Sequence, residues 1–156
     1  MSTFIGKYEV KADNKGRVFI PAHYRKLLAE GQRDRVVMRR DAYNECLVIY
    51  PLGAWDAKVE TLKASLDEWN PDDELLLMQF VSEAEYLEID TQGRVLINKK
   101  HLLTMGIDSN EMLFVGMSDR FAIWSKAAFE LCKLPATDFA SKLKNRMVRK
   151  VDGSAL

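Results

Sequence analysis

This chain has few of the residues that metal sites and disulfide frameworks depend on. Its 156 residues include two cysteines, Cys46 and Cys132, and two histidines, His23 and His101. The cysteines lie far apart in apolar sequence, which predicts buried thiols in a reducing compartment rather than a disulfide framework. The four residues show no ligand spacing, so we expect no metal site.

Long hydrophobic runs are also missing. The longest, LLLMQFV at 75–81, is far shorter than the roughly 20 residues that a membrane span needs. The first ten residues, MSTFIGKYEV, have no hydrophobic signal core. We therefore expect a cytoplasmic protein with no membrane contact.

The chain has no excess of charge of either sign, with 23 basic and 23 acidic residues. A neutral chain is a poor non-specific polyanion binder, but it can still carry a local basic patch. The charges are unevenly spread, because acids gather at 67–74 and 83–90 while KLKNRMVRK at 142–150 contains no acid. This distribution predicts a basic segment near the C-terminus.

Motifs for catalysis are absent as well. The sequence contains no glycine-rich phosphate loop, no HExxH and no GxSxG. The paired carboxylates in NPDDE and SEAE lie on predicted helices, where a solvated face explains them better than acid–base chemistry. We expect neither an enzyme nor a cofactor.

One segment occurs twice. DNKGRVFIP at 13–21 returns as DTQGRVLIN at 90–98, and the match extends to the strands and helix that follow. Each copy reads strand, turn, strand, short helix, strand, strand, helix. The aligned pairs are Asp13 with Asp90, Gly16 with Gly93, Arg17 with Arg94, Val18 with Val95 and Ile20 with Ile97.

The repeat predicts that the chain is divided into four segments. The first copy spans 4–53 and the second 86–134, with a connecting helical pair at 54–85 and a basic C-terminal helix or tail at 135–156. Apolar residues recur at helical spacing from Trp55 through Leu66 to Trp69, and Asn70-Pro71 breaks this helix. The acids at 72–74 favour the start of the second helix, and the pair is interpreted as core or subunit interface.

The repeated turn has a defined local chemistry. Asp13 can accept hydrogen bonds from backbone N–H groups ahead of it, and Gly16 tolerates a positive φ. Arg17 follows directly. It could form a salt bridge with Asp13 that locks the hairpin, or its planar fork could bind a phosphate or the edge of a guanine. The two interpretations are compatible, because a carboxylate can orient the arginine beside it.

The residues at these turns resemble those of the MraZ family, which is built from two SpoVT-AbrB-like units. The resemblance rests on FIGKYEVKADNKGRVFIP and on YLEIDTQGRVLI, and it covers residues 4–150. One departure is Asn98, where the family usually has proline. The resemblance implies an α+β fold in which two AbrB-like swapped-hairpin β units form a pseudo-twofold, barrel-like core flanked by helices.

The resemblance also implies a function. Family members are sequence-specific, DNA-binding transcriptional regulators, usually repressors, associated with the nucleoid. They act on short direct repeats in the double-stranded DNA upstream of their own division and cell-wall gene cluster, and they assemble into rings of identical subunits. The DNA-binding residues carried over by position are Asp13, Gly16, Arg17, Asp90, Gly93 and Arg94.

Lys15 is the only additional base inside either turn, and Gln92 is its counterpart in the second copy. We therefore add Lys15 to the candidate DNA-binding residues and expect the first turn to bind phosphate more strongly. This asymmetry comes from the two sequences alone.

Two alternatives stay open. AbrB-like units also occur in antitoxins, usually as one copy with a disordered toxin-binding tail, and the same scaffold could serve a protein-interaction adaptor or an enzyme. The geometry of the arginines separates the DNA-binding hypothesis from an adaptor. If Arg17 and Arg94 pair only with internal carboxylates and face away from each other, the case for DNA binding fails.

Overall fold

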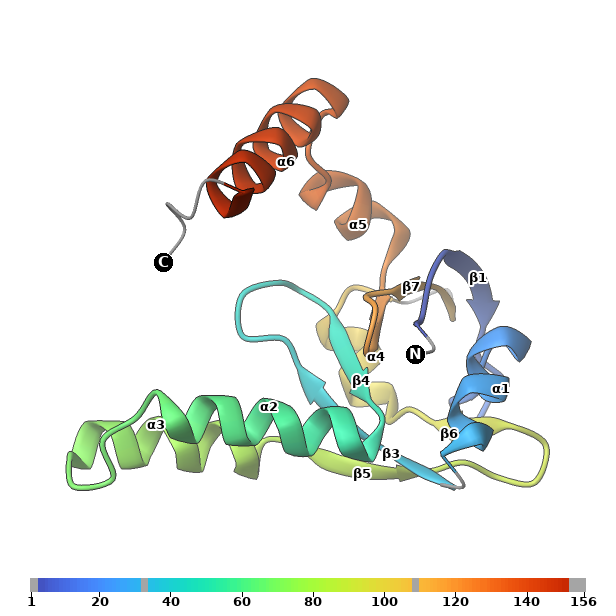
Figure 1. Cartoon of the computed structure of the whole chain (residues 1–156). Coiled ribbons are helices and arrows are strands. Elements are labelled where there is room, and N and C mark those ends of the chain that lie inside the picture. Colours follow the sequence, from blue (N-terminus) through green and yellow to red (C-terminus); the bar gives the residue numbers. More distant parts are fainter. Residues whose placement is uncertain (1–2, 32–33, 108–109, 152–156) are drawn as a thin grey trace. The chain divides into compact units, whose positions relative to one another are not determined.

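The computed structural model describes residues 3–31, 34–107 and 110–151, and the chain divides into two compact units with the boundary after Lys126. The first unit contains eight strands and four helices in the described ranges (Figure 1). In chain order these are β1 (Lys7–Lys11), β2 (Arg17–Phe19), α1 (Ala22–Glu30), β3 (Arg35–Arg40), β4 (Leu47–Tyr50), α2 (Leu52–Ala64), α3 (Pro71–Ser82), β5 (Glu85–Glu88), β6 (Arg94–Leu96), α4 (Lys99–Thr104), β7 (Glu111–Gly116) and β8 (Phe121–Trp124). The fold is α+β, as expected.

The larger sheet combines strands from both copies of the repeat. Its order is β1-β7-β8-β4-β3-β5, and every neighbouring pair is antiparallel. The first strand of each copy pairs with a strand of the other copy, because β1 lies beside β7 and β5 beside β3. At the centre β4 pairs with β8, with Val48 opposite Ala122. The two halves of the sequence therefore share one hydrogen-bonded sheet.

The expectation of a barrel-like core is wrong, because this sheet is open. Its edge strands are β1 and β5, and no described strand joins them into a closed ladder. The remaining strands, β2 and β6, are three residues long and pair only with each other. This two-stranded β2–β6 ribbon is a separate sheet and does not join the edges of the larger one.

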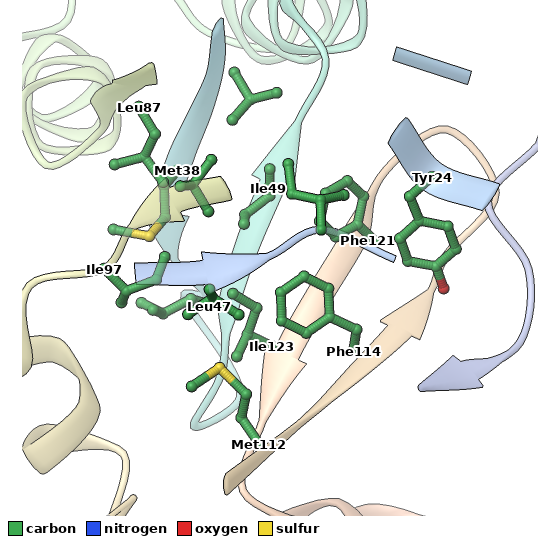
Figure 2. Packing of buried hydrophobic residues seen from close by; sticks show 14 of the residues in the cluster. Tyr24, Met38, Leu47, Ile49, Leu87, Ile97, Met112, Phe114, Phe121 and Ile123 are labelled. Carbon is green, nitrogen blue, oxygen red and sulfur yellow. The ribbon is translucent and has the colours of Figure 1, made fainter. Parts of the chain in front are cut away.

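The core lies between the sheet and the ribbon. Val18 and Val95 of the ribbon are at most 1% exposed and belong to the same buried cluster as Met38, Ile49 and Phe114 of the sheet. Figure 2 shows side chains from both halves of the sequence packed together. Burial of apolar area is the main stabilising term in folding, so the ribbon is anchored by the residues that hold the whole unit together.

Tyr24 fastens α1 onto this core. Its ring packs edge-on against Phe4, with centroids 5.2 Å apart, and lies 4.9 Å from Phe121. Its hydroxyl donates to the carbonyls of Ile5 and Gly6 at 3.1 Å, so the buried polar atom is satisfied. Burial raises the pKa of Tyr24 to about 12, which keeps the phenol neutral.

The connecting helical pair forms a hairpin of α2 and α3 attached to the sheet. Trp55 of α2 stacks on Phe80 of α3 with centroids 5.3 Å apart. The guanidinium of Arg39, a buried residue of β3, lies over the Phe80 ring and donates from Nε to the Phe80 carbonyl at 2.9 Å. These contacts hold the hairpin at a fixed place on the unit.

The helical prediction was too long at one end. Helix α2 ends at Ala64, so Leu66 and Trp69 lie beyond it, and Trp69 is 86% exposed. Asn70 caps α3 by accepting from the Asp72 amide at 2.9 Å, and the predicted acids occupy the first turn. The chain leaves the first helix early because the turn before α3 has hydrogen bonds of its own.

Asn98, the departure from the family pattern, serves as a helix cap. Its side chain accepts from the Lys100 amide at 2.9 Å, so α4 starts at Lys99. The corresponding helix of the first copy starts after Pro21, which makes no side-chain cap. Asparagine and proline are thus two solutions for starting the same helix.

The second unit contains α5 (Lys126–Cys132), whose first residue closes the first unit, and α6 (Ala136–Val151). On α6 the apolar residues Phe139, Leu143 and Met147 recur every fourth position and are at least 50% exposed. Cys132 is exposed, so the expectation of two buried thiols is right only for Cys46. None of the helices in the described ranges combines the length and apolar character needed to cross a membrane.

Candidate nucleic-acid interface

The first DxxGR turn is closed by the Asp13 carboxylate. One carboxylate oxygen, Oδ1, accepts from the backbone amides of Lys15 and Arg17, both at 2.9 Å. The other, Oδ2, accepts from the Arg17 Nε at 2.7 Å. Backbone hydrogen bonds from Gly16 to Asp13 and from Asp13 to Arg17 complete the turn.

The second turn repeats the arrangement atom by atom. Asp90 Oδ1 accepts from the amides of Gln92 and Arg94 at 2.9 Å, and Oδ2 accepts from the Arg94 Nε at 2.8 Å. The same pair of backbone hydrogen bonds closes it. The salt bridge that the sequence allowed is therefore present in both copies.

The conformation of each turn favours glycine at the position three residues after the aspartate. Gly16 has φ +90° and Gly93 has φ +82°, a region that side-chain-bearing residues rarely adopt. Space is also lacking, since a Cβ on Gly16 would lie 2.5 Å from the Ile97 carbonyl oxygen. On Gly93 it would lie 2.4 Å from the Arg25 Cδ.

Hydrogen bonding keeps both aspartates ionised. The backbone N–H of Arg17, then its side chain and the Lys15 amide, lower the pKa of Asp13 from 3.8 to about 2. The backbone N–H of Arg94 lowers the pKa of Asp90 in the same way. Both carboxylates are thus charged acceptors throughout the neutral range.

Each aspartate uses only one nitrogen of its arginine. The contacts of Arg17 and Arg94 to Asp13 and Asp90 run through Nε. Within the described residues, neither arginine has a hydrogen bond or ion pair through Nη1 or Nη2. The side chains of Arg17 and Arg94 are 36% and 19% exposed. Each guanidinium is therefore oriented by an internal carboxylate while its two terminal nitrogens stay available for an external acceptor.

Both arginines lie on one face of the β2–β6 ribbon. Arg17 is opposite Leu96 and Arg94 is opposite Phe19, while Val18 is opposite Val95. Residues opposite each other in an antiparallel pair point to the same side, and alternate residues point to the other. Val18 and Val95 face the core, so both arginines point outward together with Phe19 and Leu96, which are 52% and 55% exposed.

The adaptor hypothesis required arginines that face away from each other, and the register gives the opposite result. Arg17 and Arg94 are diagonal neighbours on the ribbon, and such pairs lie roughly 7–8 Å apart. The guanidinium of Arg94 also lies over the Phe19 ring at 5.7 Å from its centroid. The structure thus places both arginines on one ribbon face, each held by the aspartate of its own turn.

Lys15 is exposed at the tip of the first turn, and its amide is held by Asp13. Gln92 occupies the same position in the second turn. The sequence asymmetry is therefore present in the structure as one extra cation beside Arg17.

Arg25 is a residue of this surface that the repeat did not identify. It extends from α1 onto the second turn, where its Nη1 donates to the Gln92 carbonyl at 3.4 Å and its Cδ covers Gly93. The Arg25 Nε is buried with no hydrogen-bond partner among the described residues. Its repeat equivalent is Leu102, a buried core residue, so comparison of the two copies gave no signal for it.

The chain matches the sequence model of one family, described as "MraZ protein, putative antitoxin-like". The match has two segments, residues 3–78 and 80–149.

Curated relatives give the same assignment. A protein named "Transcriptional regulator MraZ" from Bacteroides fragilis is 39% identical over 94% of this chain and 92% of the relative. One of the same name from Bacteroides thetaiotaomicron is 37% identical over 94% of each chain. A third, from Shewanella denitrificans, is 32% identical over 81% of this chain and 82% of the relative. With both turns intact and matches along nearly its whole length, this chain belongs to the MraZ family.

Proposed function

We propose that this chain is a sequence-specific, DNA-binding transcriptional regulator that contacts DNA through its two DxxGR turns. The observation that carries the proposal is the pair of arginines on one ribbon face, each held through Nε by its own aspartate. The relatives are named as transcriptional regulators, which also points to a protein that is not an enzyme.

The ribbon has the dimensions that DNA recognition needs. A two-stranded β-ribbon fits the major groove, which is about 12 Å wide, and diagonal ribbon residues are closer together than that. The terminal nitrogens of Arg17 and Arg94 match the two oxygens of a phosphate or the O6 and N7 acceptors of guanine. Phe19 and Leu96 occupy the other two positions of this ribbon face and offer apolar contact to a thymine methyl group.

The exchange of β1 and β5 between the copies supports the AbrB-like swapped-hairpin interpretation. In this proposal the two AbrB-like domains are the predicted ones, 4–53 and 86–134. The helical pair at 54–85 joins them, and the basic segment at 135–156 follows. A single chain then acts as a built-in dimer that presents both turns to one DNA site.

The finer function follows the family resemblance. We place the chain at the nucleoid, as a repressor of its own division and cell-wall gene cluster, on short direct repeats of promoter DNA. A ring of identical subunits would present several such turn pairs, so weak contacts to tandem repeats would add up through effective concentration. Such a ring would allow a chain with no net charge to bind DNA tightly.

In this proposal each turn has one further cation beside its arginine. Lys15 adds a phosphate contact beside Arg17, and Arg25 adds a guanidinium beside Arg94. Each turn therefore has two cations within reach of DNA, and the first turn has no clear advantage. The sequence expectation of a stronger first turn depended on Lys15 alone.

The test is a fluorescence-anisotropy titration of labelled DNA from upstream of the gene, at two salt concentrations, with unrelated DNA as competitor. Each of Arg17→Ala and Arg94→Ala should weaken binding by roughly 5- to 150-fold, the effect of losing about 1–3 kcal/mol. Affinity should also fall with salt, with a slope that decreases by about 1 for each phosphate contact removed. Lys63→Ala on α2, which removes an exposed cation remote in sequence from both turns, is the matched control.

A folded double variant that binds as tightly as the wild type would overturn the proposal and favour an adaptor. Binding that competitor DNA removes completely would leave only a non-specific interaction. Transcription in vitro from the same promoter then distinguishes repression from activation.

The description of the matched family, "putative antitoxin-like", favours a second candidate, an antitoxin. An antitoxin needs a surface for its toxin, and the exposed apolar face of α6 is one such surface. Co-expression with each neighbouring open reading frame separates the two functions. If a neighbouring gene product slows growth and this chain relieves the defect, the antitoxin function is supported. If growth is normal with every neighbour, only the regulator function is supported.

A further inference from the structure

A groove of about 760 Å³ lies on the first unit, away from the turns. Its walls come from α2, α3, β4 and the loops after β3 and β7. Its apolar lining includes Leu62 of α2, Leu76 and Phe80 of α3, and Met117. Leu76 is 58% exposed and Met117 is 38% exposed, so part of this lining is uncovered in the single chain.

The groove is also positively charged. Arg40, Lys58 and Arg120 line it together with the buried Arg39, against a single lining carboxylate, Asp41. Arg39 is engaged internally by Phe80 and Glu83, and Arg120 by Asp119. Arg40 and Lys58 form no ion pair among the described residues. An occupant with an apolar group and negative charge would suit this lining.

The tip of the α2–α3 hairpin has these properties. Trp69 lies there and is 86% exposed, whereas a large aromatic side chain is usually buried. Five carboxylates flank it in the sequence: Asp67, Glu68, Asp72, Asp73 and Glu74. Three of them occupy the first turn of α3.

Hydrogen bonds hold this tip in one conformation. The Asp67 amide donates to Asp73 Oδ2 at 2.8 Å, and the Trp69 amide donates to Asp67 Oδ1 at 3.0 Å. Asn70 donates to the Asp67 carbonyl and caps α3. Because the backbone of the tip is already ordered, little backbone entropy is lost when Trp69 binds, and tryptophans often dominate interfaces.

We propose that the Trp69 tip of one chain docks into the Arg40–Lys58 groove of a second copy. The acidic tip and the basic groove are complementary in charge, and Trp69 supplies the aromatic side chain that the apolar lining can cover. Trp69 does not line the groove of its own chain, so the contact is between copies.

This contact joins two different surfaces, and such head-to-tail interfaces propagate from chain to chain until they close into a ring. The inference therefore gives the proposed ring a specific interface. It is tested without DNA, so its failure and that of DNA binding are distinguishable.

The first experiment compares oligomeric state by light scattering and sedimentation for three variants of the full chain. Trp69→Ala removes the tip side chain, and Arg40→Glu/Lys58→Glu reverses the groove charge. Leu75→Ala is the matched control, because Leu75 is a 56% exposed leucine of α3 outside the groove and the tip. The tip and groove variants should raise the dissociation constant by about tenfold or more, while Leu75→Ala assembles like the wild type.

Mixing the two defective variants tests the pairing itself. A Trp69→Ala chain keeps its groove and an Arg40→Glu/Lys58→Glu chain keeps its tip, so an equimolar mixture should form dimers and nothing larger. Two variants that stay monomeric when mixed would show that tip and groove are not the two halves of one contact. A monomeric wild type, or folded variants that still assemble fully, would overturn the proposal directly.

Tryptophan fluorescence gives an independent measure. Trp55 and Trp124 are 8% and 7% exposed, so Trp69 is the tryptophan open to a quencher in the single chain. Acrylamide quenching of the wild type should increase on dilution as the assembly dissociates. Trp69→Phe should abolish that change. Quenching that is independent of protein concentration in an assembled sample would contradict docking of Trp69.

Discussion

Val18 and Val95 face each other across the β2–β6 ribbon, and each is the repeat equivalent of the other. A pseudo-twofold axis therefore passes between them. The flanking hydrogen bonds obey it as well, because the Ile20 amide donates to the Gly93 carbonyl and the Ile97 amide donates to the Gly16 carbonyl. The core contact and the two DxxGR turns thus depend on one symmetric element.

This symmetry predicts equal costs for two core substitutions. Val18→Ala and Val95→Ala should each lower the free energy of unfolding by about 1–3 kcal/mol, because each deletes buried methyl groups and leaves a small cavity. The double variant should deviate from additivity by about 0.5 kcal/mol or more, as expected for residues in contact. Urea denaturation of the four proteins checks both points. Additive costs, or one much larger cost, would contradict a shared symmetric contact.

The glycines of the two turns should respond differently to alanine. Gly16→Ala brings a Cβ against a backbone carbonyl fixed in the ribbon, whereas Gly93→Ala meets the side chain of Arg25, which can move. We expect more than about 2 kcal/mol of destabilisation for the first and about 1–2 kcal/mol for the second. Gly53→Ala on α2, with nothing within 4 Å, should stabilise by up to about 1 kcal/mol. Thermal unfolding ranks the three, and the reverse order at the turns would contradict the geometry.

The turns should be insensitive to pH until strongly acidic conditions. The pKa of Asp13 is lower in the folded chain, about 2, than its ordinary 3.8, so its stabilising contribution is complete above pH 3.8 and disappears as the pH falls through 2. The amide resonances of Lys15 and Arg17 should therefore titrate with a midpoint near pH 2. Asp13→Asn is the control, because it removes the titration. A midpoint near 4 would show that these hydrogen bonds do not favour the charged carboxylate.

Arg25→Ala should weaken DNA binding several-fold without unfolding the chain. The substitution removes a cation from the second turn and uncovers Gly93, so hydrogen exchange should accelerate at Gln92 and Gly93. Lys26→Ala, the exposed neighbour on α1, is the matched control. Equal effects of the two substitutions, in anisotropy and in exchange, would show that Arg25 has no special role.

Local sequence was sufficient for the turns and insufficient for their surroundings. Aspartate, glycine and arginine at fixed spacing define a turn through short-range hydrogen bonds, so both turns could be predicted from a few adjacent residues. The place of Arg25 depends on how α1 packs against the other half of the chain. No local pattern contains that information, and its repeat equivalent, Leu102, has a different role.

The hairpin tip shows the same limit from another direction. The apolar spacing from Trp55 to Trp69 fits one long helix, but the hydrogen bonds of Asp67 and Asn70 end α2 earlier. Apolar periodicity alone does not show whether a further helical turn is more stable than a loop whose backbone groups are already hydrogen-bonded. The open sheet was missed for a related reason, since strand number and spacing do not determine whether a ladder closes.

The pairing of β1 with β7 has a consequence for how the protein is made. Lys7–Lys11 must wait for a partner strand that is synthesised roughly a hundred residues later, so the first strand leaves the ribosome well before its ladder can form. Strand β3 can pair with β4 soon after synthesis, but its other edge waits for β5. A ribosome that stops after the first copy would release a chain with unpaired strand edges, and only translation of both copies yields a unit with its internal strands paired.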